Sequence, residues 1–203
     1  IYKNYKIVKS NKTEQELCYP KEYLLQNPQK FVAQYINPDT PYTDLLVFHQ
    51  IGAGKTCASI QIAEQWKHSK HIIVATPASL IGNFRKELRT DCVKNQYITK
   101  NEQNILKKNN PTSQLYKAVI KKTDKIIDKY YTVISHQKLM AQILDKSLTF
   151  KNNVLIIDEI QNLISEYGNY YKLLYSFMTK IPKTIPVILL SGTPMFNSPL
   201  EIA

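Results

Sequence analysis

The chain has 203 residues with a hydrophobic share of 43%, enough for the buried core of one large domain. No apolar run reaches the roughly 18–20 residues that cross a membrane, and the first residues carry neither an initiator Met nor the apolar core of a signal peptide. We therefore expect a piece of a longer protein that is intracellular and soluble and has no membrane partner. The formal net charge of +11 favours contact with nucleic acid phosphates, although charge alone does not define a fold.

The three cysteines, Cys18, Cys57 and Cys92, stand far apart in the sequence and form no CxxC pair. An odd number of cysteines without metal-ligand spacing argues against a disulfide framework and against a zinc site. The sequence therefore predicts reduced thiols.

Short apolar runs alternate with amphipathic segments along most of the chain, which is typical of a parallel sheet with crossover helices. The expected strands cover residues 44–49, 71–76, 131–135, 153–158 and 186–191. The expected helices cover residues 55–66, 80–88, 137–144 and 170–180. The nearly continuous apolar run at residues 154–157 fits a strand that is buried on both faces. The pattern predicts an α/β fold in which helices flank a parallel sheet.

Two segments depart from this alternation. Residues 1–20 are polar and Lys-rich and are interpreted as an N-terminal extension. Residues 91–130 are interpreted as a polar insertion between strands, partly helical near its end, with an Asn-Asn-Pro breaker at residues 109–111. Its basic residues are Lys94, Lys100, Lys107, Lys108, Lys117, Lys121, Lys122, Lys125 and Lys129. These lysines form either a diffuse positive field for nucleic acid or a merely solvated surface.

A glycine-rich segment at residues 49–56, His-Gln-Ile-Gly-Ala-Gly-Lys-Thr, follows an expected strand and opens an expected helix. Gly52 and Gly54 allow a tight turn that points backbone N–H groups at phosphates. Lys55 is expected to reach the β- and γ-phosphates, and the Thr56 hydroxyl is expected to ligate Mg²⁺. The strict pattern of such loops begins with Gly, where this segment begins with His. The segment predicts a binding site for a nucleoside triphosphate.

Two adjacent carboxylates, Asp158 and Glu159, follow the apolar run at residues 154–157, at the strand edge where ligands bind in open α/β sheets. Asp158 is expected to hold Mg²⁺ through its water shell, and Glu159 is expected to deprotonate the attacking water. These two roles require different surroundings for the two carboxyl groups. A later strand ends in Ser-Gly-Thr-Pro, whose Ser191 and Thr193 hydroxyls are suited to passing a γ-phosphate signal across the domain.

Four motifs in this order resemble those of superfamily 2 helicases. They are Gly-Ala-Gly-Lys-Thr at residues 52–56, Thr-Pro-Ala-Ser-Leu at 76–80, Asp-Glu-Ile-Gln at 158–161 and Ser-Gly-Thr-Pro at 191–194. The resemblance covers about residues 20–203 and implies the first RecA-like lobe of such a protein, a P-loop NTPase domain assigned to residues 21–203. It also implies a second helicase lobe in the same full-length chain, which would supply arginine fingers. Little ATP turnover is therefore expected of this piece alone.

The resemblance implies roles for further residues. Gln29 matches the glutamine that reads the adenine edge ahead of the phosphate loop, although it fits a surface position on an amphipathic helix as well. Thr76 and Ser79 match motif Ia, and Ser135 lies in the region of motif Ib, two places where helicases grip a nucleic acid backbone. His136 is interpreted as a surface or core histidine. The ATP-binding set is Gln29, Gly52, Ala53, Gly54, Lys55 and Thr56, the catalytic set is Lys55, Asp158 and Glu159, the Mg²⁺ ligands are Thr56 and Asp158, and the coupling set is Gln161, Ser191 and Thr193.

Within the superfamily, the Asp-Glu-Ile-Gln motif and residues 193–199 resemble the Swi/Snf-like branch and the helicases of large nucleocytoplasmic DNA viruses, such as poxviruses, African swine fever virus and giant viruses. The resemblance implies an ATP-driven translocase on nucleic acid, with DNA favoured as the track and RNA left open, working with viral transcription machinery in the virion and the host cytoplasm. Two alternatives stay open. One is a helicase-like scaffold module of a transcription factor or virion, and the other is a translocation subunit of a restriction-type system.

Overall fold

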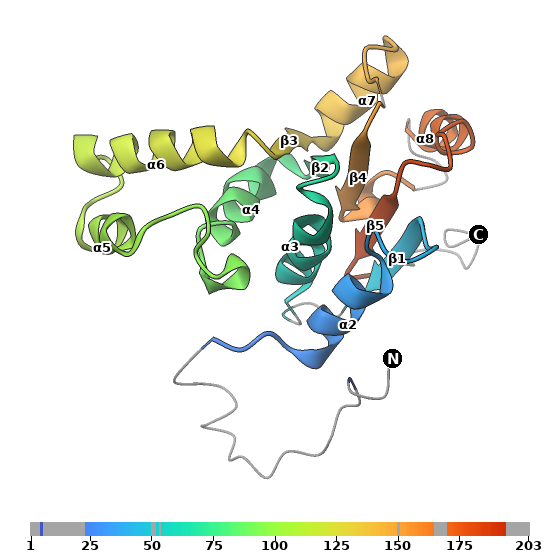
Figure 1. Ribbon diagram of the computed structural model, residues 1–203. Coiled ribbons are helices and arrows are strands. Elements are labelled where there is room, and N and C mark those ends of the chain that lie inside the picture. Colours follow the sequence, from blue (N-terminus) through green and yellow to red (C-terminus); the bar gives the residue numbers. More distant parts are fainter. Residues whose placement is uncertain are drawn as a thin grey trace.

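Five parallel strands form one sheet in the order β1-β5-β4-β2-β3 (Figure 1). The computed structural model describes residues 5, 23–49, 52, 54–149, 151–164 and 170–193. The strands are β1 (Asp44–Phe48), β2 (His71–Thr76), β3 (Tyr131–Ser135), β4 (Asn153–Asp158) and β5 (Val187–Ser191). All five predicted strands occur, and the first and the last are one residue shorter than predicted. The extension predicted for residues 1–20 lies outside the described residues apart from Tyr5.

The alternation of side chains along the central strands builds two cores, one on each face of the sheet. On β4, Val154 and Ile156 belong to one core, whereas Leu155 and Ile157 belong to the other. All four side chains are fully buried, which matches the continuous apolar run in the sequence. Burying each aliphatic side chain stabilises the folded chain by about 1.5–3 kcal/mol. A strand that is buried on both faces gains this stabilisation from successive side chains, which is why such strands lie in the middle of the sheet.

Helices cover both faces of the sheet (Figure 1). On one face lie α3 (Lys55–Trp66) and α4 (Ile81–Glu87), and on the other lie α7 (His136–Leu144) and α8 (Tyr171–Met178). Helix α2 (Asn27–Tyr35) packs against α3. Short 3-10 turns occur at η2 (Ala78–Leu80), η3 (Asp91–Val93) and η4 (Ile160–Asn162). The predicted helices agree with α3, α4, α7 and α8 to within two residues at each end. Within the described ranges, no helix has the length and apolar character needed to cross a membrane.

Residues 91–130 are more helical than the sequence predicted. Helices α5 (Lys100–Lys108) and α6 (Gln114–Ile127) form a hairpin that projects beyond β3 (Figure 1). Thr99 and Ser113 cap the two helices, because their hydroxyl oxygens accept backbone N–H groups of the first turns. Helix α6 buries Val119, Thr123 and Ile127, a four-residue spacing that the many lysines of this segment obscured.

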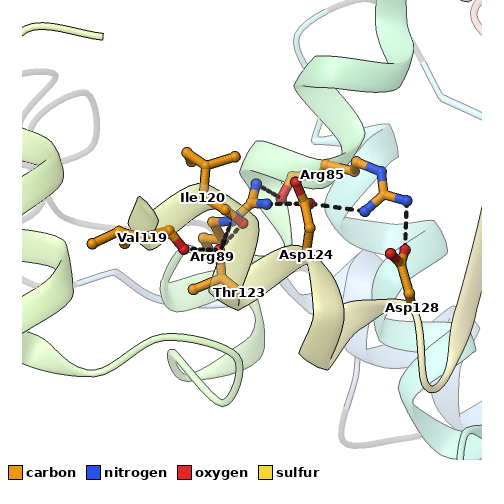
Figure 2. A network of polar contacts seen from close by, with 7 residues as sticks. All are labelled: Arg85, Arg89, Val119, Ile120, Thr123, Asp124 and Asp128. Atoms are coloured by element: carbon orange, nitrogen blue, oxygen red, sulfur yellow. Dashed lines mark hydrogen bonds and ion pairs between the residues drawn. The ribbon is translucent and has the colours of Figure 1, made fainter. Parts of the chain in front are cut away.

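The two arginines of the chain join this hairpin to the rest of the domain (Figure 2). Arg85 of α4 bonds to Asp124 at 2.8 Å and to Asp128 at 2.6 Å. Arg89, whose side chain is 7% exposed, donates to Thr123 at 2.7 Å and also pairs with Asp124. Arg89 is the buried member of this network, and loss of Asp124 would leave its charge without its ion-pair partner, so the network anchors α6 to the segment around α4.

The cysteines correct the sequence-based expectation. Cys57 of α3 and Cys92 of η3 form a disulfide across a Cα–Cα distance of 5.9 Å. Their separation of 35 residues hid the pairing, because the contact between η3 and α3 arises only in the folded chain. The pair joins the helix that follows the phosphate loop to the start of the inserted segment.

The disulfide should raise the free energy of unfolding. A closed loop of 35 residues corresponds to about 3–4 kcal/mol of unfolded-state entropy, or roughly 10 °C in the unfolding midpoint of a chain of this size. We expect a reductant to lower the midpoint of the oxidised chain by that amount in calorimetry. The double variant Cys57→Ser/Cys92→Ser should melt at the lower temperature with or without reductant. Equal midpoints for the oxidised, reduced and double-variant forms would contradict a stabilising bridge.

Candidate active site

The carboxyl ends of β1, β5 and β4 bring three of the predicted motifs to one edge of the sheet. The phosphate loop follows β1, the acid pair ends β4, and Ser191 ends β5, which lies between those two strands. Parallel strands place their carboxyl ends at the same edge, where open α/β sheets bind ligands. The motifs separated by about a hundred residues in the sequence are therefore neighbours.

The phosphate loop contains two glycines in the left-handed region. Gly52 has a φ of 84° and Gly54 a φ of 73°, values that favour glycine over other residues. A Cβ atom on Gly54 would also collide with the Nε2 atom of Gln29. Helix α3 starts directly after Gly54, so its positive N-terminal end faces the loop. Gln50, Ile51 and Ala53 lie outside the described residues.

Gln29 is buried, which corrects the alternative of a surface glutamine on α2. Its Oε1 atom accepts the backbone N–H of Gln26 at 2.8 Å, and its Nε2 atom donates to the carbonyl of Gly54 at 3.1 Å. The side chain thus ties the start of α2 to the phosphate loop. Among the described residues, each end of the amide keeps one further hydrogen-bonding position, and the role in adenine recognition stays a prediction.

Lys55 connects the phosphate loop to the acid pair. Its Nζ atom lies 3.4 Å from Oδ1 of Asp158 and forms a short hydrogen bond with Oε1 of Glu159. The side chains of Lys55 and Asp158 are 12% and 6% exposed, so little water screens this pair. The residue expected to reach the phosphates and the residues expected to hold Mg²⁺ and activate water therefore occupy one site.

The two carboxyl groups have different surroundings. Burial by itself raises the pKa of Glu159, but the hydrogen bonds from Lys55 and Gln161 outweigh burial and hold that pKa below its ordinary value. The pKa of Asp158 lies above its ordinary value, because burial disfavours its charge more than Lys55 favours it. The two carboxyl groups thus have the different surroundings that the sequence analysis required, while their roles as Mg²⁺ ligand and base stay predictions.

A chain of hydrogen bonds leads from Glu159 to the end of β5. Gln161 donates through Nε2 to Oε2 of Glu159 and accepts the hydroxyl of Ser191 at 2.8 Å. The backbone N–H of Thr193 donates to that same hydroxyl at 3.1 Å. The three residues predicted to couple the motifs are thus joined side by side, and both ends of the Gln161 amide are used. Pro194 and the residues after it lie outside the described residues.

Glu159 stands in a backbone conformation that is rare for its type, with φ 53° and ψ 48°. A non-glycine residue in this left-handed region costs of order 1–3 kcal/mol and persists when its surroundings hold it. The holding contacts are the hydrogen bonds to its carboxylate and the bond from its own N–H to Oδ1 of Asp158 at 3.0 Å. This turn aims the carboxylate at Lys55.

Thr56 and Asp158 offer the oxygen ligands that Mg²⁺ prefers, a hydroxyl and a buried carboxylate. Thr56 follows Lys55 in the first turn of α3, and Asp158 faces the Lys55 ammonium at 3.4 Å. The chemistry of this donor set fits a hard divalent cation. The set was assigned from the sequence and stays a prediction.

The residues predicted to contact nucleic acid differ in exposure. Thr76 is fully buried at the end of β2, and its Oγ1 atom has no hydrogen-bond partner among the described residues. This corrects the expectation for Thr76, because a buried hydroxyl cannot touch a nucleic acid backbone. Ser79 of η2 is exposed, and Ser135 is half-buried, with its Oγ atom accepting the N–H of Lys138. The two serines remain candidates.

One residue of the site was missed by the sequence analysis. His136 is 4% exposed and donates through Nε2 to the carbonyl oxygen of Asp158 at 2.7 Å. The acceptor is a carbonyl, so Nε2 must carry the proton. Burial lowers the pKa of His136, although the Asp158 carbonyl opposes this shift. The available signal was its place directly after a predicted strand end, where the other site residues lie.

Comparisons with known proteins agree with this site. The model of the DEAD/DEAH box helicase family matches residues 29–202. A putative ATP-dependent RNA helicase of Acanthamoeba polyphaga mimivirus is 46% identical over 202 residues, which are 100% of this chain and 35% of that protein. The termination factor NPH-I homolog of African swine fever virus is 27% identical over 165 residues, which are 78% of this chain and 21% of that protein. The predicted resemblance to helicases of large DNA viruses is thereby confirmed.

A solved structure supports the predicted fold. The crystal structure of the Pyrococcus furiosus Hef helicase domain matches with a TM-score of 0.52 at 16% identity, over 86% of this chain and 34% of that one. The parallel sheet flanked by helices is accordingly RecA-like, as predicted. This chain spans about a third or less of the length of the curated relatives named above. Because the family model covers residues 29–202, the chain belongs to the DEAD/DEAH box helicase family.

Proposed function

We propose that this chain is the ATP-binding first lobe of a nucleic-acid-dependent ATPase that translocates on DNA. The observation that carries the proposal is the contact of Lys55 with both Asp158 and Glu159 at the edge of the sheet. A scaffold module without catalysis would have no need of this arrangement. The coupling chain from Glu159 through Gln161 to Ser191 supports a site built for hydrolysis rather than for binding alone.

The residues of the site divide the work of ATP hydrolysis. Lys55 pairs with the carboxylates and is placed to turn toward the β- and γ-phosphates, which would leave Asp158 free to hold the cation. Thr56 supplies the second protein ligand. Bound Mg²⁺ neutralises charge that develops on the phosphates. Glu159, held in its ionised form, accepts the proton of the attacking water, and Gln161 keeps its carboxylate oriented.

The nucleic acid track is proposed to pass the loops after β2 and β3, where Ser79 and Ser135 can bond to a phosphate backbone. DNA is the track favoured by the resemblance to viral transcription proteins, and the African swine fever virus relative is named as a termination factor. RNA is the second candidate, because the mimivirus relative is named as an RNA helicase. A second lobe in the full-length protein is proposed to supply the arginine that the phosphates need.

The ATPase rate of the full-length protein tests this proposal. We expect it to rise with single-stranded or duplex DNA more than with RNA, and residues 1–203 alone should respond little. An arginine supplied by another lobe is worth roughly 10³–10⁵ in rate in related enzymes. A full-length protein that hydrolyses no ATP would favour the scaffold alternative. A larger response to RNA would keep the motor and change its track.

Lys55 and Glu159 should separate binding from chemistry. Lys55→Ala removes a cation from the phosphates, so the affinity for ATP and the turnover should both fall. Glu159→Gln keeps the shape of the side chain but removes the base, so ATP should still bind while hydrolysis slows by roughly 10²–10⁴-fold. Fluorescent-nucleotide binding and ATPase rates of the full-length protein measure both effects. Lys107→Ala, an exposed residue of α5, is the control. Normal turnover in Glu159→Gln would exclude Glu159 as the base.

The lysines of α6 provide a separate prediction. Lys117, Lys121 and Lys125 are exposed at four-residue spacing on one side of the helix, beside the hollow that Tyr116 and Ile120 line, whereas Lys122 is held by Glu102 at 2.7 Å. Asp124 of this helix and Asp128 at its C-cap are paired with Arg85 and Arg89 (Figure 2), so they offset little of the lysines' charge.

Replacing Lys117, Lys121 and Lys125 with Gln should reduce the slope of log affinity against log salt by about 2–3, since each phosphate contact contributes about 0.9 on duplex and about 0.7 on single strands. A salt titration of nucleic acid binding measures the slope. The control with the same loss of charge replaces Lys172, Lys180 and Lys183, which are exposed on and after α8. An unchanged slope in the α6 variant would show that these lysines are a solvated surface.

A further inference from the structure

His136 connects two parts of the site that the sheet keeps apart. It is the first residue of α7, directly after Ser135 at the end of β3. Strand β2 lies between β3 and β4, yet the Nε2 atom of His136 reaches the Asp158 carbonyl at the end of β4 at 2.7 Å. A buried side chain therefore spans the end of β2 and contacts the backbone of the proposed Mg²⁺ ligand.

The Asp158 carbonyl lies where regular strand pairing stops. The paired residues of β2 and β4 end at Ala75 and Ile157, one position before Asp158. The next residue, Glu159, leaves the strand in the left-handed conformation. The peptide that joins Asp158 to Glu159 therefore lacks a partner from β2 in the sheet ladder, and His136 supplies a donor to it. His136 is therefore in direct contact with the peptide that joins the two acids.

The other end of this connection lies at the candidate nucleic acid loop. Ser135 caps α7 through its Oγ atom, which accepts the N–H of Lys138, and is half-buried beside exposed residues of the first turn. Its paired residue on β2 is Thr76, whose buried hydroxyl has no partner among the described residues. A polar atom without a partner is a place where a small rearrangement gains a hydrogen bond. The bridge thus spans a strand end whose buried hydroxyl has no partner among the described residues.

We propose that His136 is a positioning residue that transmits nucleic acid binding at the loop after β3 to the Asp158–Glu159 peptide, and so to ATP hydrolysis. The proposal rests on the function proposed above, in which Asp158 holds Mg²⁺ and the loop after β3 contacts the track. His136 itself touches neither ATP nor nucleic acid. Its imidazole N–H holds the carbonyl of Asp158 in the orientation that the acid pair needs for stimulated turnover.

Two variants of matched length separate this role from simple packing. His136→Gln keeps an N–H donor, whereas His136→Met fills the space with an unbranched side chain that has none. Both are made in the full-length protein, and melting curves define a temperature at which all forms are folded. The readouts are the basal kcat, the kcat with saturating single-stranded DNA, duplex DNA or RNA, the KM for ATP and the affinity for the nucleic acid.

The Met variant should lose roughly 10–100-fold of the stimulated kcat, the usual effect of removing a group that orients a metal ligand. Its basal kcat should fall less, and its KM for ATP and its affinity for the nucleic acid should change little. The Gln variant should recover most of the stimulation. If the Met variant has the same stimulated kcat as the wild type, the proposal is overturned. Equal losses of stimulated kcat in the Met and Gln variants would also overturn it, because they indicate a packing role.

The wild-type protein distinguishes failure of this inference from failure of the proposed function. If no nucleic acid stimulates the wild type, the proposed motor is wrong and nothing remains for His136 to transmit. If the wild type is stimulated and the Met variant behaves like it, the motor stands and the transmitting role of His136 is excluded.

Discussion

The ion pairs of Lys55 with Asp158 and Glu159 are the interaction on which the rest of the site depends. Lys55 and Glu159 are 104 positions apart in the sequence, and the pairs form because β1 and β4 flank β5 in the sheet. A cation and two carboxylates with little exposed surface are stable only as a set, since the loss of one partner leaves charge uncompensated in a poorly hydrated place. Two left-handed glycines before α3 bring Lys55 to the edge, and the left-handed Glu159 turns its carboxylate toward it. Backbone conformations of low intrinsic stability are therefore held by electrostatic contacts, as is common at functional sites.

The acid pair stands at the centre of the sheet edge and is contacted from two strands away on each side. Lys55 follows β1, which is the strand beyond β5, and His136 follows β3, which is the strand beyond β2. The intervening strand ends carry hydroxyls, Ser191 on β5 and Thr76 on β2, and they differ in one respect. The hydroxyl of Ser191 has two hydrogen bonds, whereas that of Thr76 has none among the described residues. The hydroxyl that ends β5 thus belongs to the hydrogen-bond chain of the acid pair, whereas the hydroxyl that ends β2 still has a hydrogen bond to gain.

The α5–α6 hairpin adds positive charge without disturbing this edge. Its attachment uses the two arginines of the chain, whose planar guanidinium groups suit the branched contacts with Asp124 and Asp128 (Figure 2). Because those acids are occupied, the exposed lysines of α6 meet little opposing charge. Arg85 lies on α4, which follows the motif Ia turn that contains Ser79, and Arg89 lies two residues beyond the end of that helix. The α5–α6 hairpin with its exposed lysines and the candidate track loop at Ser79 thus both adjoin α4.

The sequence by itself determined the strands and most helices, and it named the residues of the proposed ATP site that the fold brings to one edge. Buried parallel strands need continuous apolar runs, and a phosphate loop needs glycines followed by lysine, so both leave local patterns. Only the tertiary structure decided the disulfide between Cys57 and Cys92, the burial of Thr76 and the bridge from His136 to Asp158. These three depend on which elements become neighbours, and that follows from the strand order and the helix packing rather than from any local pattern. The hydroxyl of Thr76 looks the same in the sequence whether it faces solvent or core, and the sheet places it in the core.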